Sequence, residues 1–435
     1  MQKTILVGVN LNDDPDFEHS MEELESLAEA CELEVAARMV QNLPAVNNAF
    51  YIGSGKVEEL KNLASILEAE YVIFDNSLSP SQQRNLQKEI EVSVLDRTNL
   101  ILEIFDRRAQ TKEARLQVES ANLQYMLPRL VGMREALSRQ GGGAGAGGGA
   151  GAGGGFSNRG AGEKKLELDR RKIEKRISDL GKELEVIEKE RETQRKRRRE
   201  SDLPSVALVG YTNAGKSTLL NRMLDAYMGD AEKKVMEKDM LFATLDTTVR
   251  RISPGDNRDF LLSDTVGFID KLPHTLVKAF RSTLAEACSA DLLLQVVDFS
   301  DPHYKDQMRV TQETLRELGA GEIPCLFVMN KAERVMDPEE LPKVAGDRIY
   351  MSAKDGTGLE ELLSLIREIL FSDYVDCEMI VPYGDGAAVS YLKENAVVHL
   401  MDYGQEGVIL KLQCKKSDAG RYKKYITGQK QEAVS

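Results

Sequence analysis

The octapeptide GYTNAGKS, residues 210–217, decides the fold of the domain that contains it. It follows the apolar run SVALV and precedes the helical sequence STLLNRML, so we expect a strand, a tight loop and a helix in succession. The backbone N–H groups of such a loop, together with the N-terminus of the helix, can surround a phosphate anion. We predict that Lys216 reaches the β and γ phosphates of a nucleotide and that the Ser217 hydroxyl holds Mg²⁺. The predicted phosphate-binding residues are Gly210, Tyr211, Thr212, Asn213, Ala214, Gly215, Lys216 and Ser217.

Three further motifs follow along the chain, each at the end of a predicted strand. They are DTVG at 264–267, NKAE at 330–333 and SAK at 352–354. Asp264 is placed to hold the water shell of Mg²⁺, and the Gly267 N–H is placed to sense the γ phosphate. The order of the four motifs distinguishes a GTPase from an ATPase or a kinase. The nucleotide-binding residues predicted from these three motifs are Asp264, Thr265, Val266, Gly267, Asn330, Lys331, Glu333, Ser352, Ala353 and Lys354.

The base-reading motif has a glutamate where an aspartate is expected. The acid at this position accepts hydrogen bonds from N1–H and the 2-amino group of guanine, a donor pair that adenine lacks. Glu333 keeps the carboxylate but places it one methylene further from the backbone. We therefore expect weaker guanine binding or looser discrimination against adenine, and an ATP-preferring enzyme is an alternative.

A GTPase also needs a threonine that reaches Mg²⁺ and the γ phosphate when GTP is bound. The segment KDMLFATLDTTVRR lies between the phosphate loop and DTVG, and it offers Thr244, Thr247 and Thr248. All three are candidates on the residues alone.

Charge is distributed unevenly along the 435 residues. The net charge is −13, which by itself disfavours a nucleic-acid partner. Residues 107–139 carry +4 and residues 159–199 carry +6, so the rest of the chain carries −23. The basic residues therefore flank QGGGAGAGGGAGAGGGF, residues 140–156, which between its ends holds only glycine and alanine. A molecule polarised in this way can present its basic part to RNA.

Apolar residues on both sides of this glycine tract recur at the spacing of a coiled coil. Those before the tract are Leu116, Leu123, Leu127, Leu130 and Leu137, and those after it are Leu166, Ile173, Ile177, Leu180, Leu184 and Ile187. We predict two helices that pair as an antiparallel hairpin, with the glycine tract at its tip.

Strand and helix patterns alternate before and after the hairpin, which predicts an α/β protein. We expect an N-terminal parallel α/β subdomain over residues 1–106 and the helical hairpin over 107–200, with its Gly-rich tip at 141–155. A P-loop GTPase domain with a doubly wound sheet follows over 201–371, and a small α+β domain over 372–435. The segment YIGSGKVEEL resembles a phosphate loop, but Phe50 replaces its first glycine and Val57 follows Lys56. We therefore predict a turn before a helix, with an anion contact as the alternative.

The sequence predicts a cytoplasmic location. No apolar run approaches the ~18 residues of a membrane-spanning helix, and the N-terminus is acidic where a signal peptide is apolar. The five cysteines are scattered without a CxxC pair, which suits reduced thiols and disfavours zinc. We expect a monomer without a membrane anchor.

The motifs and the phrases around them resemble the HflX family of ribosome-associated GTPases, in the Obg-like branch of the P-loop GTPases. The resemblance covers most of the chain and rests on GSGKVEEL, NLQYMLPRL, LSRQGGG, RGAGEKKLELDRR, GYTNAGKSTLLN, LFATLDTTVRR and SDTVGFIDKLPHTLVKAFRSTLAEACSADLLLQVVD. It implies hydrolysis of GTP to GDP with Mg²⁺, binding to the large ribosomal subunit, and dissociation of stalled or idle ribosomes, especially under stress. Some relatives protect against antibiotics that act at the peptidyl transferase centre.

The resemblance also implies roles for individual residues. It places the nucleotide-dependent threonine in a switch made of Phe242, Ala243, Thr244, Leu245 and Asp246. Thr244 would then act with Lys216 and Gly267 in catalysis. Mg²⁺ would be held by Ser217, by Thr244 and, through water, by Asp264.

By the same resemblance, the hairpin tip points toward the peptidyl transferase centre. A glycine-rich chain lacks side chains that would block a narrow RNA cavity, and it stays flexible until it is bound. The flanking Arg139, Phe156 and Arg159 are the candidate rRNA contacts. A passive loop that only closes the hairpin is the alternative.

Several features depart from the family or from other GTPases. Glu333 replaces the base-reading aspartate, Thr247 replaces the proline usual after Asp246, and the glycine tract is longer. Phe268 follows DTVG where many GTPases have a glutamine that orients the attacking water. Because phenylalanine cannot hydrogen-bond to water, we expect slow intrinsic hydrolysis that speeds up on the ribosome.

Two other functions stay open at this point. A GTPase of this branch could instead assist assembly of the large subunit. Alternatively, the chain could be a coiled-coil interaction module in which the nucleotide only stabilises the fold.

Overall fold

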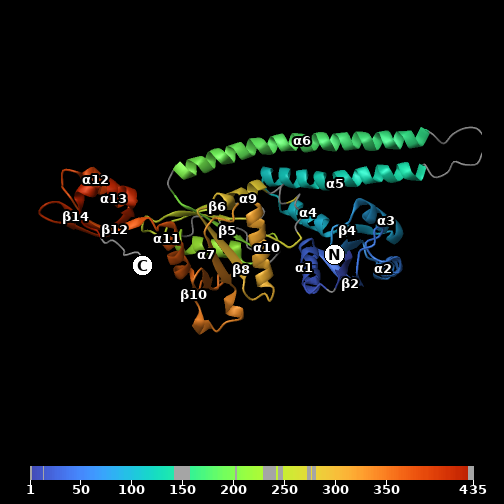
Figure 1. Ribbon diagram of the computed structural model, residues 1–435, viewed down its shortest axis with the longest axis horizontal. Helices are drawn as coiled ribbons and strands as arrows, with labels where there is room; N and C mark the ends of the chain where they lie inside the picture. Colours follow the sequence, from blue (N-terminus) through green and yellow to red (C-terminus); the bar gives the residue numbers. More distant parts are fainter. Residues whose placement is uncertain are drawn as a thin grey trace, which may run out of the picture. The chain divides into compact units, whose positions relative to one another are not determined.

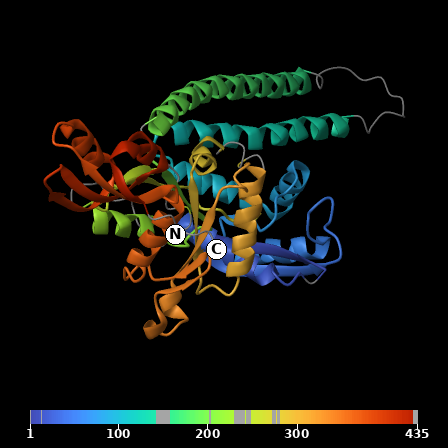
Figure 2. The same ribbon diagram turned by 60° about the vertical axis from the view of Figure 1, so that its left-hand side comes forward.

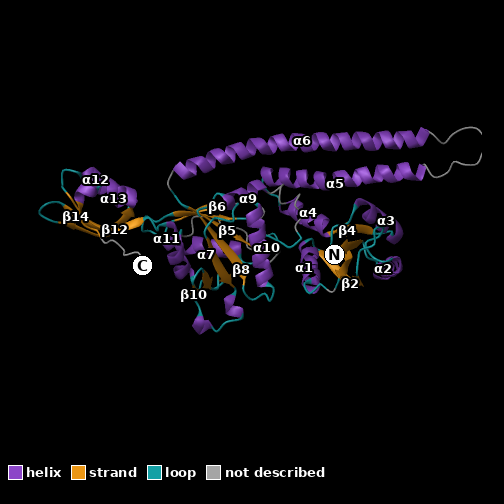
Figure 3. Cartoon of the chain, viewed as in Figure 1, coloured by secondary structure: helices purple, strands orange, loops and turns teal. Residues whose placement is uncertain are grey.

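The computed structural model describes residues 2–12, 14–141, 157–200, 203–228, 242, 248–271, 276 and 281–429. Its contacts divide the chain into two compact units. The first comprises Met1–Gln194, Lys238–Asp246 and Ile269–Thr283, and the second comprises Arg195–Glu237, Thr247–Phe268 and Leu284–Ser435. Each unit is α/β, as the sequence predicts (Figure 3). The division into four domains stays a prediction.

The first unit begins with a four-stranded parallel sheet of order β2-β1-β3-β4. Its strands are β1 (Gln2–Leu11), β2 (Leu33–Leu43), β3 (Tyr71–Phe74) and β4 (Ser93–Asp96). The helices between and after them are α1 (Phe17–Ala30), α2 (Ser54–Leu67), α3 (Pro80–Ile90) and α4 (Arg97–Arg108). The predicted turn before a helix at YIGSGKVEEL is confirmed, because Gly53 is the N-cap of α2.

Strand β1 is buried on both faces, which explains its unbroken apolar sequence. Ile5, Val7 and Val9 belong to a core that also contains residues of α2 and α3. Alternate residues face the other way, where a Cβ on Gly8 would lie 2.4 Å from Met21 Sδ of α1. Helices therefore cover both faces of this sheet.

Two long helices, α5 (Lys112–Gly141) and α6 (Ser157–Glu200), form the predicted hairpin. They run side by side in both views (Figures 1 and 2). Arg176 donates to both Glu119 carboxylate oxygens at 2.7 and 2.8 Å, and Arg191 pairs with Glu113 at 2.6 Å. Because residues later in α6 pair with residues earlier in α5, the helices are antiparallel. The glycine tract from 142 onward, with Phe156, lies outside the described residues.

The hairpin is fixed to the sheet by a buried carboxylate at the end of β4. Asp96 is inaccessible to solvent and accepts hydrogen bonds from the Tyr125 hydroxyl at 2.7 Å and from Arg129 at 3.2 Å. The Arg129 guanidinium also lies 3.3 Å from the centroid of the Tyr125 ring. Burial, followed by the charge of Asp96, raises the pKa of Tyr125, so its hydroxyl stays protonated and donates.

The second unit contains a seven-stranded sheet of order β10-β11-β9-β8-β5-β7-β6. Its strands are β5 (Ser205–Gly210), β6 (Thr248–Ile252), β7 (Phe260–Asp264), β8 (Leu292–Asp298), β9 (Cys325–Asn330), β10 (Lys343–Ala345) and β11 (Arg348–Tyr350). The edge strands β6 and β10 are antiparallel to their neighbours, and the other pairs are parallel. The helices α7 (Lys216–Tyr227), α9 (Arg281–Cys288), α10 (Tyr304–Glu317) and α11 (Leu359–Leu370) connect or flank the strands.

The second unit ends with an antiparallel sheet of order β13-β14-β12-β15. Its strands are β12 (Tyr374–Val381), β13 (Val397–Tyr403), β14 (Val408–Lys415) and β15 (Ile426–Gln429), with α12 (Gly386–Asn395) and α13 (Lys416–Arg421). Asn257 connects it to the larger sheet, because its amide donates to the Lys393 and Ala396 carbonyls at 2.8 and 2.9 Å.

Within the described part of the chain, no helix is long and apolar enough to cross a bilayer.

The attachment of the hairpin can be tested with Tyr125→Phe. We expect a loss of about 1–3 kcal/mol in the free energy of unfolding, because the substitution removes a donor from a buried carboxylate. Urea unfolding measures this loss. Tyr403→Phe is the control, since the Tyr403 side chain is 67% exposed, and it should cost less than ~0.5 kcal/mol. Equal effects of the two substitutions would contradict the assigned role of Tyr125.

Candidate nucleotide-binding site

The phosphate loop joins β5 to α7, and two of its glycines are required by their surroundings. Gly210 has φ 143°, and a Cβ there would lie 2.2 Å from the Val296 carbonyl oxygen. Gly215, the N-cap of α7, has φ 96°, and its Cβ would lie 2.2 Å from Asn330 Nδ2. Any larger residue would push apart the strands or the loops that form the site.

Lys216 points back into its own loop. Its Nζ donates to the Gly210 and Tyr211 carbonyl oxygens at 3.0 and 2.8 Å. Burial lowers the pKa of Lys216 to about 8, while the nearby Asp264 carboxylate opposes this shift. A phosphate anion bound in the loop would favour the charged form of this amine.

Asp264 lies beside the start of α7, because β7 pairs with β5 in parallel. Its Oδ2 accepts a hydrogen bond from the Ser217 hydroxyl at 2.8 Å, and the side chain is inaccessible to solvent. Thr265 is fixed next to it by a 2.7 Å bond to the Leu208 carbonyl. A hydroxyl and a carboxylate at this separation form the hard oxygen donor set that suits Mg²⁺.

The DTVG segment closes onto the phosphate loop through its backbone. Phe268 N–H donates to Gly210 O at 3.1 Å, and Phe268 O accepts from Thr212 N–H at 2.8 Å. A Cβ on Gly267 would lie 2.8 Å from Thr212 Cγ2 and 3.1 Å from Lys216 Nζ. Gly267 is therefore next to the amine of Lys216. The Phe268 side chain is buried, as is that of Val266.

Asn330 joins three loops. Its Nδ2 donates to the Ala214 carbonyl at 2.8 Å, and its Oδ1 accepts from Ala353 N–H at 2.9 Å. Lys331 also reaches the phosphate loop, with Nζ 2.9 Å from the Asn213 carbonyl oxygen. The phosphate loop, NKAE and SAK thus meet at one edge of the sheet.

Glu333 lies in the short helix η1 (Ala332–Arg334). Its Oε2 is buried and has no hydrogen-bond partner among the described residues. An unpaired buried acceptor is costly, so a donor supplied by a ligand would stabilise this oxygen. In the SAK loop, Ser352 is buried and bonded to Asp355 at 2.8 Å, and the Lys354 carbonyl accepts from Arg222.

Two acids in the site were not predicted. Asp298 Oδ2 accepts from Lys331 Nζ at 2.7 Å, and Asp355 bonds to Ser352. Asp298 ends β8, the parallel neighbour of β9, so its position at a strand end was the available signal. Asp355 follows SAK directly, and nothing in the sequence pattern marks it.

Some predicted residues are not placed in this site. Ala243, Thr244, Leu245, Asp246 and Thr247 lie outside the described residues. Phe242 is described, but it belongs to the first unit. Thr248 begins β6, and its buried Oγ1 has no hydrogen-bond partner among the described residues.

For the candidate rRNA contacts, the structure gives the secondary structure of two residues and no side-chain environment. Arg139 lies in α5 and Arg159 in α6, while Phe156 is outside the described residues. The arrangement of the tip stays a prediction.

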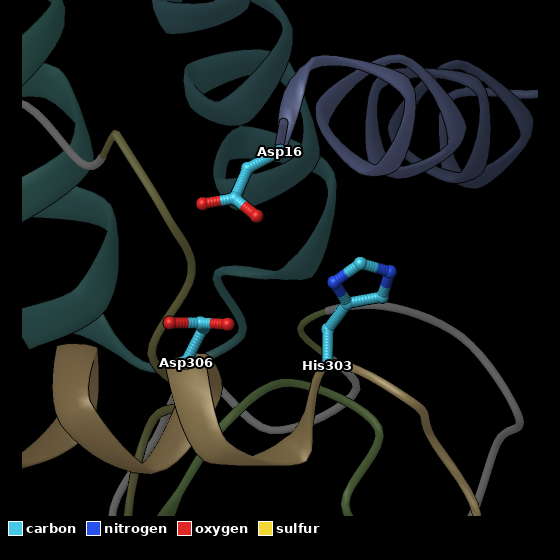
Figure 4. Close-up of side chains that lie close together, drawn as sticks. All are labelled: Asp16, His303 and Asp306. Atoms are coloured by element: carbon cyan, nitrogen blue, oxygen red, sulfur yellow. The ribbon is translucent and has the colours of Figure 1, made fainter. Parts of the chain in front are cut away.

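Figure 4 draws one further group of acidic and histidine side chains, Asp16, His303 and Asp306. Asp16 belongs to the first unit and the other two belong to the second. No metal site is therefore inferred from them.

Comparison with known proteins places the site in a family. Models described as GTP-binding GTPase N-terminal, GTP-binding GTPase Middle Region and 50S ribosome-binding GTPase match residues 18–106, 108–198 and 205–331. A crystal structure of a GTP-binding protein from Sulfolobus solfataricus in complex with GDP is 27% identical, with a TM-score of 0.42. The similarity covers 86% of this chain and 99% of that chain.

The curated relatives named GTPase HflX include proteins from Lacrimispora saccharolytica and Escherichia coli. The protein from Lacrimispora saccharolytica is 42% identical over 410 residues, which cover 94% of this chain and 92% of that protein. The protein from Escherichia coli is 39% identical over 391 residues, which cover 88% and 87%. With this identity over most of its length, the chain belongs to the HflX family of GTPases, enzymes that hydrolyse GTP to GDP and phosphate.

Proposed function

We propose that this chain is a GTP-driven switch that binds the large ribosomal subunit and dissociates stalled or idle ribosomes, above all under stress. The observation that carries the GTP-driven part is the meeting of the phosphate loop, NKAE and SAK at Asn330, with Gly267 beside Lys216. The ribosomal part is supported by the match of residues 205–331 to a model described as 50S ribosome-binding GTPase.

In this proposal the residues of the loop act on the phosphates. Lys216 binds the β and γ phosphates, and the backbone N–H groups of Asn213 and of 215–217 donate to their oxygens. The Gly267 N–H contacts the γ phosphate and is released after hydrolysis. Asn330 keeps the loops in register, and the free Glu333 oxygen accepts from the guanine base.

The donor set near Lys216 fits Mg²⁺. Ser217 would hold the ion directly and Asp264 through water. The resemblance implies Thr244 as a further ligand. When bound, the ion neutralises charge on the phosphates. This chain's own residues orient those phosphates and exclude water from the loop.

The hairpin supplies the proposed contact with RNA. Its basic segments at 107–139 and 159–199 carry net charges of +4 and +6, while the remainder of the chain carries −23. Lysine and arginine side chains neutralise RNA phosphates with an affinity that falls steeply as salt rises. Contacts by Arg139, Phe156 and Arg159 at the tip are part of this proposal. A cytoplasmic, monomeric protein is the state expected from the sequence, and it stays a prediction.

Reading of the base by Glu333 can be tested by paired titrations of GTP and ATP. We expect GTP to bind more tightly, and we expect Glu333→Gln to reduce that preference by about 1–3 kcal/mol, which is about 5- to 150-fold in the ratio of Kd values. The amide replaces one acceptor oxygen with a donor that faces guanine donors. Glu339→Gln, at an exposed acid nearby, is the matched control. Equal affinities for GTP and ATP in the unaltered protein would refute guanine recognition.

The buried ring of Phe268 cannot orient the attacking water, so we expect slow hydrolysis by the protein alone and stimulation by the ribosome. Single-turnover hydrolysis should be slow for the protein alone and faster with large subunits, on the order of 10³-fold, if rRNA or protein completes the site. Small subunits are the control. Equal rates with and without large subunits would reject this prediction.

Dissociation itself can be tested by sucrose-gradient sedimentation of intact ribosomes with the protein and GTP. We expect the ribosome peak to shift to separate subunits, and we expect Gly267→Ala to abolish the shift, since its Cβ would lie 2.8 Å from Thr212 Cγ2. An unchanged peak together with binding to immature large subunits would favour an assembly factor instead. Absence of GTP turnover would favour the interaction module.

A further inference from the structure

A group of buried charges lies at the carboxyl ends of β3 and β4 in the first unit. Asp75 follows β3, and Arg97 follows β4, which is its parallel neighbour. Arg97 Nη1 contacts Asp75 Oδ1 at 2.7 Å, and its other terminal nitrogen pairs with Glu23 of α1. The Ser20 hydroxyl donates to Asp75 Oδ2 at 2.8 Å. All four side chains are buried.

The charge of this group is balanced by a residue from the segment after DTVG. Lys271 Nζ lies 2.6 Å from Asp75 Oδ2 and 2.6 Å from Ser20 Oγ. Two carboxylates then face two cations. Burial raises the pKa of Asp75 above its usual range, and the charge of Lys271 opposes that rise. Withdrawal of Lys271 would leave Arg97 to serve both acids.

Phe242, the first residue of the predicted switch, packs against helix α4 of the N-terminal subdomain. The Phe242 ring packs edge-on against Phe105 of α4, with centroids 4.7 Å apart and an interplanar angle of 80°. Both rings are buried. Phe242 precedes the predicted switch residue Thr244 by two positions. The first unit includes Lys238–Asp246 and Ile269–Thr283, whereas the phosphate loop, DTVG, NKAE and SAK lie in the second unit.

We propose that Lys271 is a positioning residue, which ties the segment after DTVG to Asp75 and so makes the N-terminal subdomain respond to the bound nucleotide. Gly267 and Lys271 are four residues apart, so we expect a displacement of Gly267 to be passed along the chain to the Lys271–Asp75 ion pair. This inference takes one premise from the proposed function, which is that the DTVG segment has different conformations with GTP and with GDP.

The response has a physical route to the hairpin. Arg97 and Asp96 are neighbours in the chain: Arg97 bonds to Asp75, and Asp96 bonds to Tyr125 and Arg129 of α5. Both side chains are buried, so neither can move without disturbing its partners. These ion pairs and hydrogen bonds, joined by the peptide bond between Asp96 and Arg97, connect Lys271 to the middle of α5.

Hydrogen exchange of the full-length protein tests the proposal. Exchange at residues 71–76 and 93–99 is measured with GDP and with a non-hydrolysable GTP analogue. The unaltered protein should show a difference of at least about fivefold between the two nucleotides, the lower end of typical couplings. Lys271→Met should abolish most of this difference while keeping both nucleotide affinities within about threefold.

Two variants separate this role from a structural one. Lys271→Arg keeps the cation and should retain the nucleotide-dependent difference. Lys61→Met removes an exposed ion pair with Glu91, 2.7 Å long and in the same subdomain, and should leave the difference intact. A merely structural Lys271 would change exchange equally with both nucleotides.

Two results would overturn the proposal: no nucleotide-dependent difference in the unaltered protein, or a full difference in Lys271→Met. Ribosome sedimentation with the same proteins keeps the two proposals distinct. If the unaltered protein does not split ribosomes, the proposed function fails, but the exchange data still decide the role of Lys271.

Discussion

The side-chain amide of Asn330 holds the nucleotide site together. It donates to one loop and accepts from another, while its own backbone belongs to a third. An aspartate of the same size could not donate to the Ala214 carbonyl, which would then be left buried and unpaired. The site therefore depends on an amide at this position, and buried, fully satisfied bonds of this kind give a single arrangement of loops. The close approach of Gly215 to the same amide leaves no space for an alternative.

The hairpin and the rest of the chain carry opposite net charges. The hairpin helices are basic, whereas the rest of the chain carries a large negative charge. In the proposed function, the acidic part of the chain would repel RNA phosphates and the basic helices would attract them, which would favour an approach to RNA through the hairpin. Within the hairpin, ion pairs such as Arg176–Glu119 connect the helices to each other, so part of the positive charge has a structural role.

Sequence patterns that span a few residues predicted those elements whose residues are close together in the chain. The phosphate loop, the parallel N-terminal sheet and the hairpin were expected from spacing and composition, and the structure contains them. Strands β12 and β15 were not expected, although Cys377, Met379 and Val381 alternate with more exposed residues in β12. The ion pair of Lys271 with Asp75 joins residues 196 positions apart, so no local pattern could reveal it. Likewise, the free oxygen of Glu333 became visible only once its surroundings were known.

The junction between β4 and α4 has a consequence for how this chain can vary. The strand ends at Asp96 and the helix begins at Arg97, so no connecting residue separates them. Their side chains serve different partners, one in the hairpin and one at the end of β3. A single residue inserted here would have to extend either β4 or α4. In both cases the side chain of Asp96 or of Arg97 would turn away from its partner. We therefore expect length variation to be excluded from this junction and to accumulate elsewhere, for example in the glycine tract.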